Sequence, residues 1–151
     1  MTRAPRPARI TPRGVAGRPA LDDTSVLFTY GTLMRGLPLH GLLAGRATFL
    51  GKGVLAARLI DLGRYPGAIP DAGARVRGEV FRLESRELWT TLDSAEGPQY
   101  HRRRAPVAMG RRSIEAYVYW YCGPLDRGVP IPGGDWRGHA PARSIHRSPT
   151  V

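Results

Sequence analysis

The stretch Val26-Leu27-Phe28-Thr29-Tyr30-Gly31-Thr32-Leu33-Met34 decides how this chain is organised. Apolar, aromatic and β-branched residues favour a strand, and Gly31 has no Cβ, so the chain can turn sharply there. A glycine at a strand end also lets backbone N–H groups converge on a small anionic or carbonyl group. The stretch therefore predicts a buried strand over 25–29 followed by a turn. That turn is either an ordinary strand-to-loop corner or part of a binding site.

The second informative stretch is Leu92-Asp93-Ser94-Ala95-Glu96-Gly97-Pro98-Gln99-Tyr100. A serine cap predicts a helix over 85–96, and Gly97 with the proline after it predicts its end. Leu88, Leu92 and Glu96 recur every four residues, so they share the helix stripe that should pack inward. Burial and the negative end of the helix dipole both raise the pKa of such a carboxyl group. A raised pKa is what a general base working near neutral pH requires.

A second interpretation of Glu96 stays open at this point. The last helical turn could fray, which would leave the carboxylate in solvent and paired with Arg102 or Arg103. Spacing alone does not decide between the two interpretations. Asp93, three residues earlier, is the other carboxylate of the stretch.

The segments around these two stretches predict further strands. Residues 47–61 are apolar and contain glycines, and 75–83 contain one at Gly78, so both are expected as extended chain with bends or close approaches at glycine. Residues 63–67 predict a turn. Two strands are expected near 100–109 and 113–122. Both faces of the last one are apolar or aromatic, so it should lie centrally in a closed or covered sheet.

The charge of the chain is concentrated at its ends. The formal net charge is +11, but residues 1–21 carry five arginines and no acidic residue, and 137–151 carry three more. Residues 22–136 hold fifteen basic and twelve acidic residues, a net charge of +3. This distribution, without an aromatic-basic repeat, argues against a nucleic-acid-binding core. The run Arg102–Arg104 is either a solvated charge run or a guide for an anionic substrate.

Cysteine use and hydropathy predict a soluble cytoplasmic protein. The single cysteine, Cys122, excludes an intramolecular disulfide and suits a reducing compartment. No apolar run approaches the roughly 20 residues that a membrane helix needs. The start of the chain, rich in Arg and Pro, does not resemble a signal peptide.

Other chemistries find little support. The histidines His40, His101, His139 and His146 are scattered, so no metal site is expected. Cys122 ends an apolar strand and is expected as an inert thiol rather than a nucleophile. No serine has the surroundings of a nucleophile elbow.

Six short motifs occur in one order along the chain. They are Tyr30-Gly31-Thr32-Leu33, Gly63-x-Tyr65-Pro66, Val76-x-Gly78-Glu79-Val80-Phe81, Leu92-Asp93-x-x-Glu96-Gly97, Tyr100-x-Arg102 and Ala116-x-Val118-Tyr119. In this register the chain resembles the gamma-glutamylcyclotransferase-like family, which includes gamma-glutamylamine cyclotransferases and a cyclotransferase of butirosin biosynthesis. The resemblance covers about residues 26–121.

The resemblance implies an α+β fold, a small and mostly antiparallel β-barrel with flanking short helices. It implies that the turn of Tyr30, Gly31, Thr32 and Leu33 holds the substrate through backbone N–H groups, and that Glu96 is the catalytic base. A tyrosine on a late strand often closes the pocket in the family. Tyr119 is the candidate here, and Tyr100 is the second.

The implied activity is that of a lyase or acyltransferase-type enzyme. It would cyclise a γ-glutamyl amide to 5-oxoproline and release an amine or amino acid, with no metal, nucleotide or redox cofactor. The partner would be a small γ-glutamyl compound, with neither a membrane nor a nucleic acid expected. The leaving amine and the oligomeric state are not specified.

Two alternatives remain beside the enzyme. One is a non-catalytic module of the same fold that binds small molecules, and the other is a nucleic-acid binder acting through the arginine-rich ends. The expected organisation is a disordered basic arm over 1–22, one domain over 23–137, and a disordered tail over 138–151. No periodic element is expected after Cys122.

Overall fold

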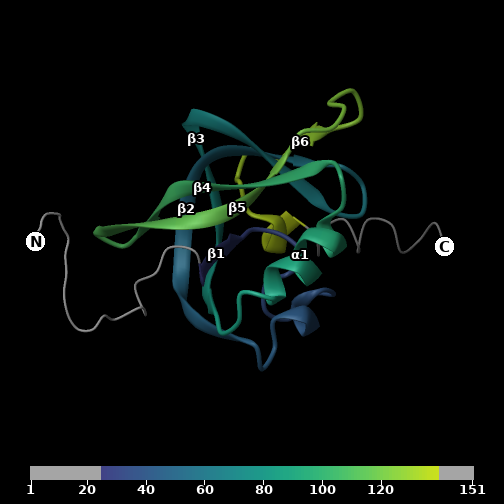
Figure 1. Cartoon of the computed structure of the whole chain (residues 1–151). Coiled ribbons are helices and arrows are strands. Elements are labelled where there is room, and N and C mark those ends of the chain that lie inside the picture. Colours follow the sequence, from purple (N-terminus) through teal and green to yellow (C-terminus); the bar gives the residue numbers. More distant parts are fainter. Residues whose placement is uncertain (1–24, 140–151) are drawn as a thin grey trace, which may run out of the picture.

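The structure is a computed structural model and describes residues 25–139 (Figure 1). The described residues form six strands, one α-helix and a 3-10 turn at His40–Leu42. Their order is β1 (Val26–Thr29), β2 (Ala47–Asp61), β3 (Pro66–Leu83), α1 (Leu88–Glu96), β4 (Tyr100–Met109), β5 (Arg112–Tyr121) and β6 (Val129–Pro130). The expected arm, and the part of the expected tail after residue 139, lie outside the described residues.

The strands pair in the order β3-β1-β5-β4-β2-β6, and β2 also pairs with β3. The pairings therefore run from β3 through β1, β5, β4 and β2 back to β3. Only β1 and β5 are parallel, and every other pair is antiparallel. The expected α+β fold with a mostly antiparallel sheet is confirmed, while its closure into a barrel stays a prediction.

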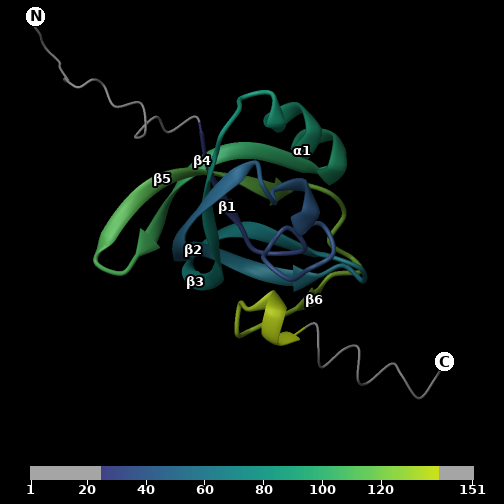
Figure 2. The same ribbon diagram turned by 90° about the horizontal axis from the view of Figure 1, so that it is seen from below.

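Two hydrophobic clusters lie on the two faces of the sheet. One face packs against α1, where Leu88, Trp89 and Leu92 meet Leu27 and Phe81. The other face buries Phe28, Val80 and Val118 together with Ile131 and Trp136 from the C-terminal end of the domain. Figure 2 shows α1 and the yellow C-terminal segment on opposite sides of the strands. Strand β5 contributes to both clusters, so the prediction that it is covered on both faces is confirmed.

Glycines shape the long strands as expected. At Gly51 (φ 144°) the β2–β3 register shifts, so the strand carries a bulge there. Gly78 lies opposite Gly53 in the same pair, and a Cβ at Gly78 would stand 2.6 Å from Cζ of Phe28. The close approach at Gly78 brings the ring of Phe28 onto the sheet.

Two expectations about element limits were wrong. The helix begins at Leu88 instead of residue 85, because the Ser85 hydroxyl accepts a 3.1 Å hydrogen bond from N–H of Glu87 and closes a separate turn. Strand β3 begins at Pro66 instead of residue 75, since its first residues pair with the end of β2.

The segment after Cys122, where no further periodic element was expected, contains a short strand and a helical turn. Strand β6 pairs with the end of β2, and Trp136, in a short helical turn at 136–139, is 3% exposed. No helix within residues 25–139 has the length and apolar character to cross a bilayer.

Candidate active site

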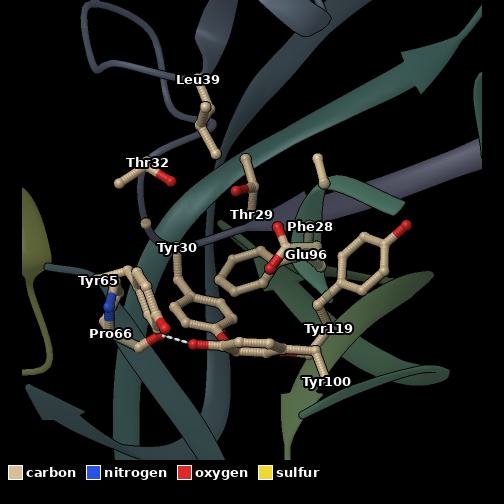
Figure 3. Close-up of a pocket in the computed structure, with 12 residues that line it drawn as sticks. Phe28, Thr29, Tyr30, Thr32, Leu39, Tyr65, Pro66, Glu96, Tyr100 and Tyr119 are labelled. Atoms are coloured by element: carbon tan, nitrogen blue, oxygen red, sulfur yellow. Dashed lines mark hydrogen bonds between the residues drawn. The ribbon is translucent and has the colours of Figure 1, made fainter. Parts of the chain in front are cut away.

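A pocket of about 180 Å³ opens where the end of β1 meets the C-terminal end of α1 (Figure 3). Its walls come from β1 and the following turn, the β2–β3 connection, α1, β4 and β5. The lining residues are Phe28, Thr29, Tyr30, Gly31, Thr32, Leu39, Tyr65, Pro66, Ala95, Glu96, Tyr100 and Tyr119. Six of the seven residues named from the sequence are therefore brought together.

The turn after β1 presents backbone donors to this pocket. Its carbonyl groups are used: N–H of Met34 donates to Gly31 O at 3.0 Å, and N–H of Leu39 donates to Thr32 O at 2.8 Å. Within residues 25–139, no group accepts a hydrogen bond from N–H of Gly31, Thr32 or Leu33. Free N–H groups on adjacent residues form a cradle for a carboxylate or an oxyanion.

Gly31 is required by close packing and not by its backbone angles. It is not among the glycines with positive φ, but a Cβ there would lie 2.8 Å from Cγ and 3.0 Å from Cδ of Pro66. Pro66 lines the pocket opposite the turn, so the missing side chain lets the two walls approach.

Glu96 is the ionisable carboxyl group of the pocket. Figure 3 shows it among the rings of Phe28, Tyr30 and Tyr119. Burial in this aromatic setting, with a further contribution from the charge of Asp93, raises the pKa of Glu96 to about 7. Within the described part of the chain, Glu96 has no hydrogen bond or ion pair. Glu96 ends an intact helix and is partly buried in the pocket, so the interpretation with a frayed last turn and Glu96 in solvent, paired with Arg102 or Arg103, is wrong.

Arg102 pairs with Asp93 instead of Glu96. Its Nε donates to Oδ1 of Asp93 at 2.9 Å, and its guanidinium also lies over the Trp89 ring. The Tyr119 hydroxyl donates to the same Oδ1 at 2.6 Å. Burial raises the pKa of Asp93, but the hydrogen bonds from Arg102 and Tyr119 outweigh it, and the pKa is lowered. The two carboxylates, one turn apart, thus differ in character: Asp93 is fixed and ionised, and Glu96 titrates near neutrality.

The tyrosines form the walls of the pocket through hydrogen bonds to backbone. Tyr30 donates to Tyr119 O at 2.6 Å and accepts from N–H of Ala68 at 3.1 Å, so it links β1 to β5 and β3. Tyr100 donates to Pro66 O at 2.7 Å. Burial is the largest cause that raises the pKa of Tyr30, Tyr100 and Tyr119, so all three hydroxyl groups stay protonated at neutral pH.

Leu33 is the predicted site residue that does not line the pocket. Its side chain is 2% exposed and belongs to the cluster under α1, because the turn directs it into the core. Its carbonyl oxygen faces Nδ1 of His40 at 2.9 Å. Only its backbone N–H is available for a binding role.

Sequence reasoning missed six lining residues. Tyr65 and Pro66 belong to one of the six motifs, so a signal for them existed although the motif suggested no role. The other four are Phe28, Thr29, Leu39 and Ala95. Among residues 25–139, no three His, Cys, Asp or Glu side chains gather in a metal-binding arrangement.

Comparison with known proteins shows to which family the chain belongs. The model of the family described as "Gamma-glutamyl cyclotransferase, AIG2-like" matches residues 27–138. The chain belongs to this family. The motifs that indicated it, together with Glu96 and the Tyr30 turn, all fall inside the matched range, and the predicted family is confirmed.

Relatives agree in sequence and in structure. The gamma-glutamylcyclotransferase family protein YtfP of Escherichia coli K12 is 37% identical over 81 residues, which are 52% of this chain and 66% of YtfP. The match thus spans just under two thirds of YtfP. The putative gamma-glutamylcyclotransferase MJ1514 of Methanocaldococcus jannaschii is 27% identical over 75% of this chain and 96% of its own. The crystal structure of PH0828 from Pyrococcus horikoshii superposes with a TM-score of 0.65 at 25% identity, over 81% of this chain and 98% of that one.

Proposed function

We propose that this protein is a cyclotransferase that converts a γ-glutamyl amide into 5-oxoproline and a free amine, with Glu96 as the general base. The observation that carries the proposal is Glu96 itself. Its carboxyl group has a pKa of about 7 and no pairing partner within residues 25–139, and it shares the pocket with a turn whose N–H groups have no acceptor within those residues. Family membership supports the reaction type.

The reaction is intramolecular. Glu96 takes a proton from the α-ammonium of the γ-glutamyl group, and the freed nitrogen attacks the side-chain carbonyl carbon of that same group. The new C–N bond closes a five-membered lactam, and the bond to the departing amine breaks. Two protons leave the attacking nitrogen and end on the departing amine, and Glu96 is the group placed to carry them. Glu96 is ionised again at the end of the cycle.

The chain contributes mainly orientation to this chemistry. Nucleophile and electrophile are tethered, so the aromatic walls need only hold the substrate in a folded conformer. The N–H groups of 31–33 bind its α-carboxylate or the oxyanion that develops on the carbonyl oxygen. The circuit of strand pairings supports the small barrel expected of the family, which would keep both halves of the site on rigid strands.

The decisive experiment measures 5-oxoproline release from a panel of γ-glutamyl amides. Glu96→Gln keeps the shape of the side chain but cannot accept the proton, so turnover should fall by about 10²- to 10⁴-fold. Binding of 5-oxoproline should persist, because the backbone supplies it. Asp93→Asn is the matched control on the same helix and should be much milder.

Two results would contradict the proposal. Near-normal turnover in Glu96→Gln would show that Glu96 is not the general base. Wild-type protein that binds γ-glutamyl compounds without turning them over would favour the non-catalytic binding module.

A further inference from the structure

A buried carboxylate outside the pocket contacts the chain just after the turn that follows β1. Glu79 of β3 is 4% exposed and does not line the pocket, so the reaction proposed above does not use it. An ionised carboxylate in such a place is tolerated only with charged partners and hydrogen bonds. Its partners therefore indicate what the residue does.

The side chain of Glu79 accepts three hydrogen bonds. N–H of the Arg35 backbone donates to Oε1 at 2.9 Å, and Nε of Arg35 donates to Oε2 at 3.3 Å. A guanidinium nitrogen of Arg137 donates to Oε2 at 3.0 Å. Both arginine side chains are nearly half exposed, whereas the carboxylate between them is buried. The bond to the backbone of Arg35 is the one that acts on the path of the chain.

The hydrogen bond from Arg35 N–H to Glu79 lies at the end of the loop that contains the N–H groups of residues 31–33. The backbone of Glu79 pairs with Thr29, the last residue of β1, and its side chain holds the backbone of Arg35. One residue of β3 thus fixes the chain just before and just after 30–34. That segment contains the three free N–H groups of the turn. Their direction depends on where the two ends of the loop are fixed.

We propose that Glu79 is a positioning residue, which orients the N–H groups of 31–33 toward the substrate by anchoring the Arg35 backbone. The proposal rests on the cyclotransferase function proposed above. It assigns substrate binding to Glu79 and leaves proton transfer to Glu96. It also separates the roles of the three hydrogen bonds, because only the bond from the Arg35 backbone sets the turn.

The kinetic test compares three variants on one γ-glutamyl amide. Glu79→Ala removes the acceptor and should raise KM by about tenfold or more, with kcat changed by less than about threefold. Glu79→Gln keeps an oxygen for the Arg35 N–H and should recover most of the KM. Arg35→Gln removes the guanidinium but not the backbone donor, so its KM should stay near wild type. In all three, the ionisation near pH 7 in the pH profile should not move, since it belongs to Glu96.

A residue that only stabilises the fold would give a different pattern. Glu79→Ala would then lower the melting temperature with KM unchanged, and this result would overturn the proposal. A KM that rises equally in Glu79→Gln, Glu79→Ala and Arg35→Gln would also overturn it, because the ion pair and not the backbone bond would matter.

Hydrogen exchange gives a test that depends neither on turnover nor on Glu79→Ala folding. In the wild-type chain the Arg35 amide should exchange slowly, and it should stay largely protected in Glu79→Gln, which keeps the acceptor oxygen. Rapid exchange of the Arg35 amide in wild type would overturn the anchor. Absence of 5-oxoproline release with a protected Arg35 amide would instead refute the proposed function and leave the anchor in place.

Discussion

Glu96 shows how one residue can be costly for the fold and useful for the chemistry. The aromatic burial that raises its pKa to about 7 leaves a proton acceptor that is about half ionised at neutral pH. We therefore expect kcat/KM to fall as the pH drops below about 7, because protonated Glu96 cannot act as a base. Asp93→Asn removes the smaller cause of the raised pKa and should move this limb slightly to lower pH. A limb near the ordinary carboxyl range, or one unmoved by Asp93→Asn, would contradict this account.

The raised pKa of Glu96 also predicts how stability depends on pH. The folded-state pKa, about 7, lies above the ordinary value of 4.5, so folding disfavours the ionised form. Below pH 4.5 Glu96 is protonated in both the folded and the unfolded state, so its contribution to the free energy of unfolding is intact. As the pH rises through 7, this contribution is lost. The loss is about 1.4 kcal/mol for each pH unit that separates the two pKa values. Glu96→Gln should thus raise the melting temperature by several degrees at pH 8 and hardly at all at pH 4.5. Equal effects at both values would show that the carboxyl group is not desolvated.

Gly31 is expected to be intolerant of any side chain. A valine there would push into Pro66, whose carbonyl oxygen holds the Tyr100 hydroxyl, so two walls of the pocket would shift together. Gly31→Val should abolish 5-oxoproline binding, measured by calorimetry, while far-UV circular dichroism stays close to wild type. Gly41→Ala is the control, because a Cβ at Gly41 meets nothing within 4 Å. Retained affinity in Gly31→Val would exclude the turn from the site.

At the scale of elements, the sequence predicted those parts that local pattern controls. Strands β1 and β5 follow from runs of apolar and aromatic residues, and the end of α1 follows from Gly97 (φ 93°). The early part of β3 could not be predicted, because glycine, proline and aspartate there disfavour a strand until β2 pairs with them. The segment around Trp136 has no periodicity and is ordered by the cluster it completes.

The site shows the same division. The order of the short motifs indicated the family, and the family resemblance pointed to Glu96 and to the turn after β1 as site residues. The hydrogen bonds that shape the pocket join residues far apart in sequence: Tyr30 reaches Tyr119, and Glu79 reaches Arg35. Periodicity does not encode such pairings, so the position of the Leu33 side chain in the core under α1 became apparent only in three dimensions.

The attachment of α1 to β5 gives a test at this scale. The Tyr119 hydroxyl donates to Asp93 at 2.6 Å, so Tyr119→Phe loses a hydrogen bond to a carboxylate that Arg102 still holds. We expect a loss of about 1 kcal/mol in the free energy of unfolding, measured with urea. Tyr117→Phe is the control from the same strand. The centroid of the Tyr117 ring lies 5.2 Å from that of Trp89, but the Tyr117 hydroxyl has no hydrogen-bond partner within residues 25–139. Equal losses in the two variants would show that the bond to Asp93 contributes nothing.

At the scale of the molecule, charge and packing divide the chain in different places. Residues 1–21 and 137–151 carry eight of the eleven net positive charges, but Arg137 and His139 belong to the packed domain. Arg137 binds Glu79, and Nε2 of His139 lies 2.8 Å from Oδ2 of Asp61, which is 9% exposed. A boundary drawn on charge alone therefore falls inside the last helical turn.

Two truncated chains test where the domain ends. Residues 22–139 should fold and keep their activity on a γ-glutamyl amide, because the sequences removed lack apolar periodicity. The chain of residues 22–137 loses the contact from His139 to Asp61 and places its new carboxylate terminus beside the pairing of Arg137 with Glu79. Its melting temperature should be lower by several degrees, and its KM should rise if the turn loosens with Glu79. Aggregation of the 22–139 chain, or a melting temperature far below that of the full chain, would show that residues beyond these limits stabilise the fold.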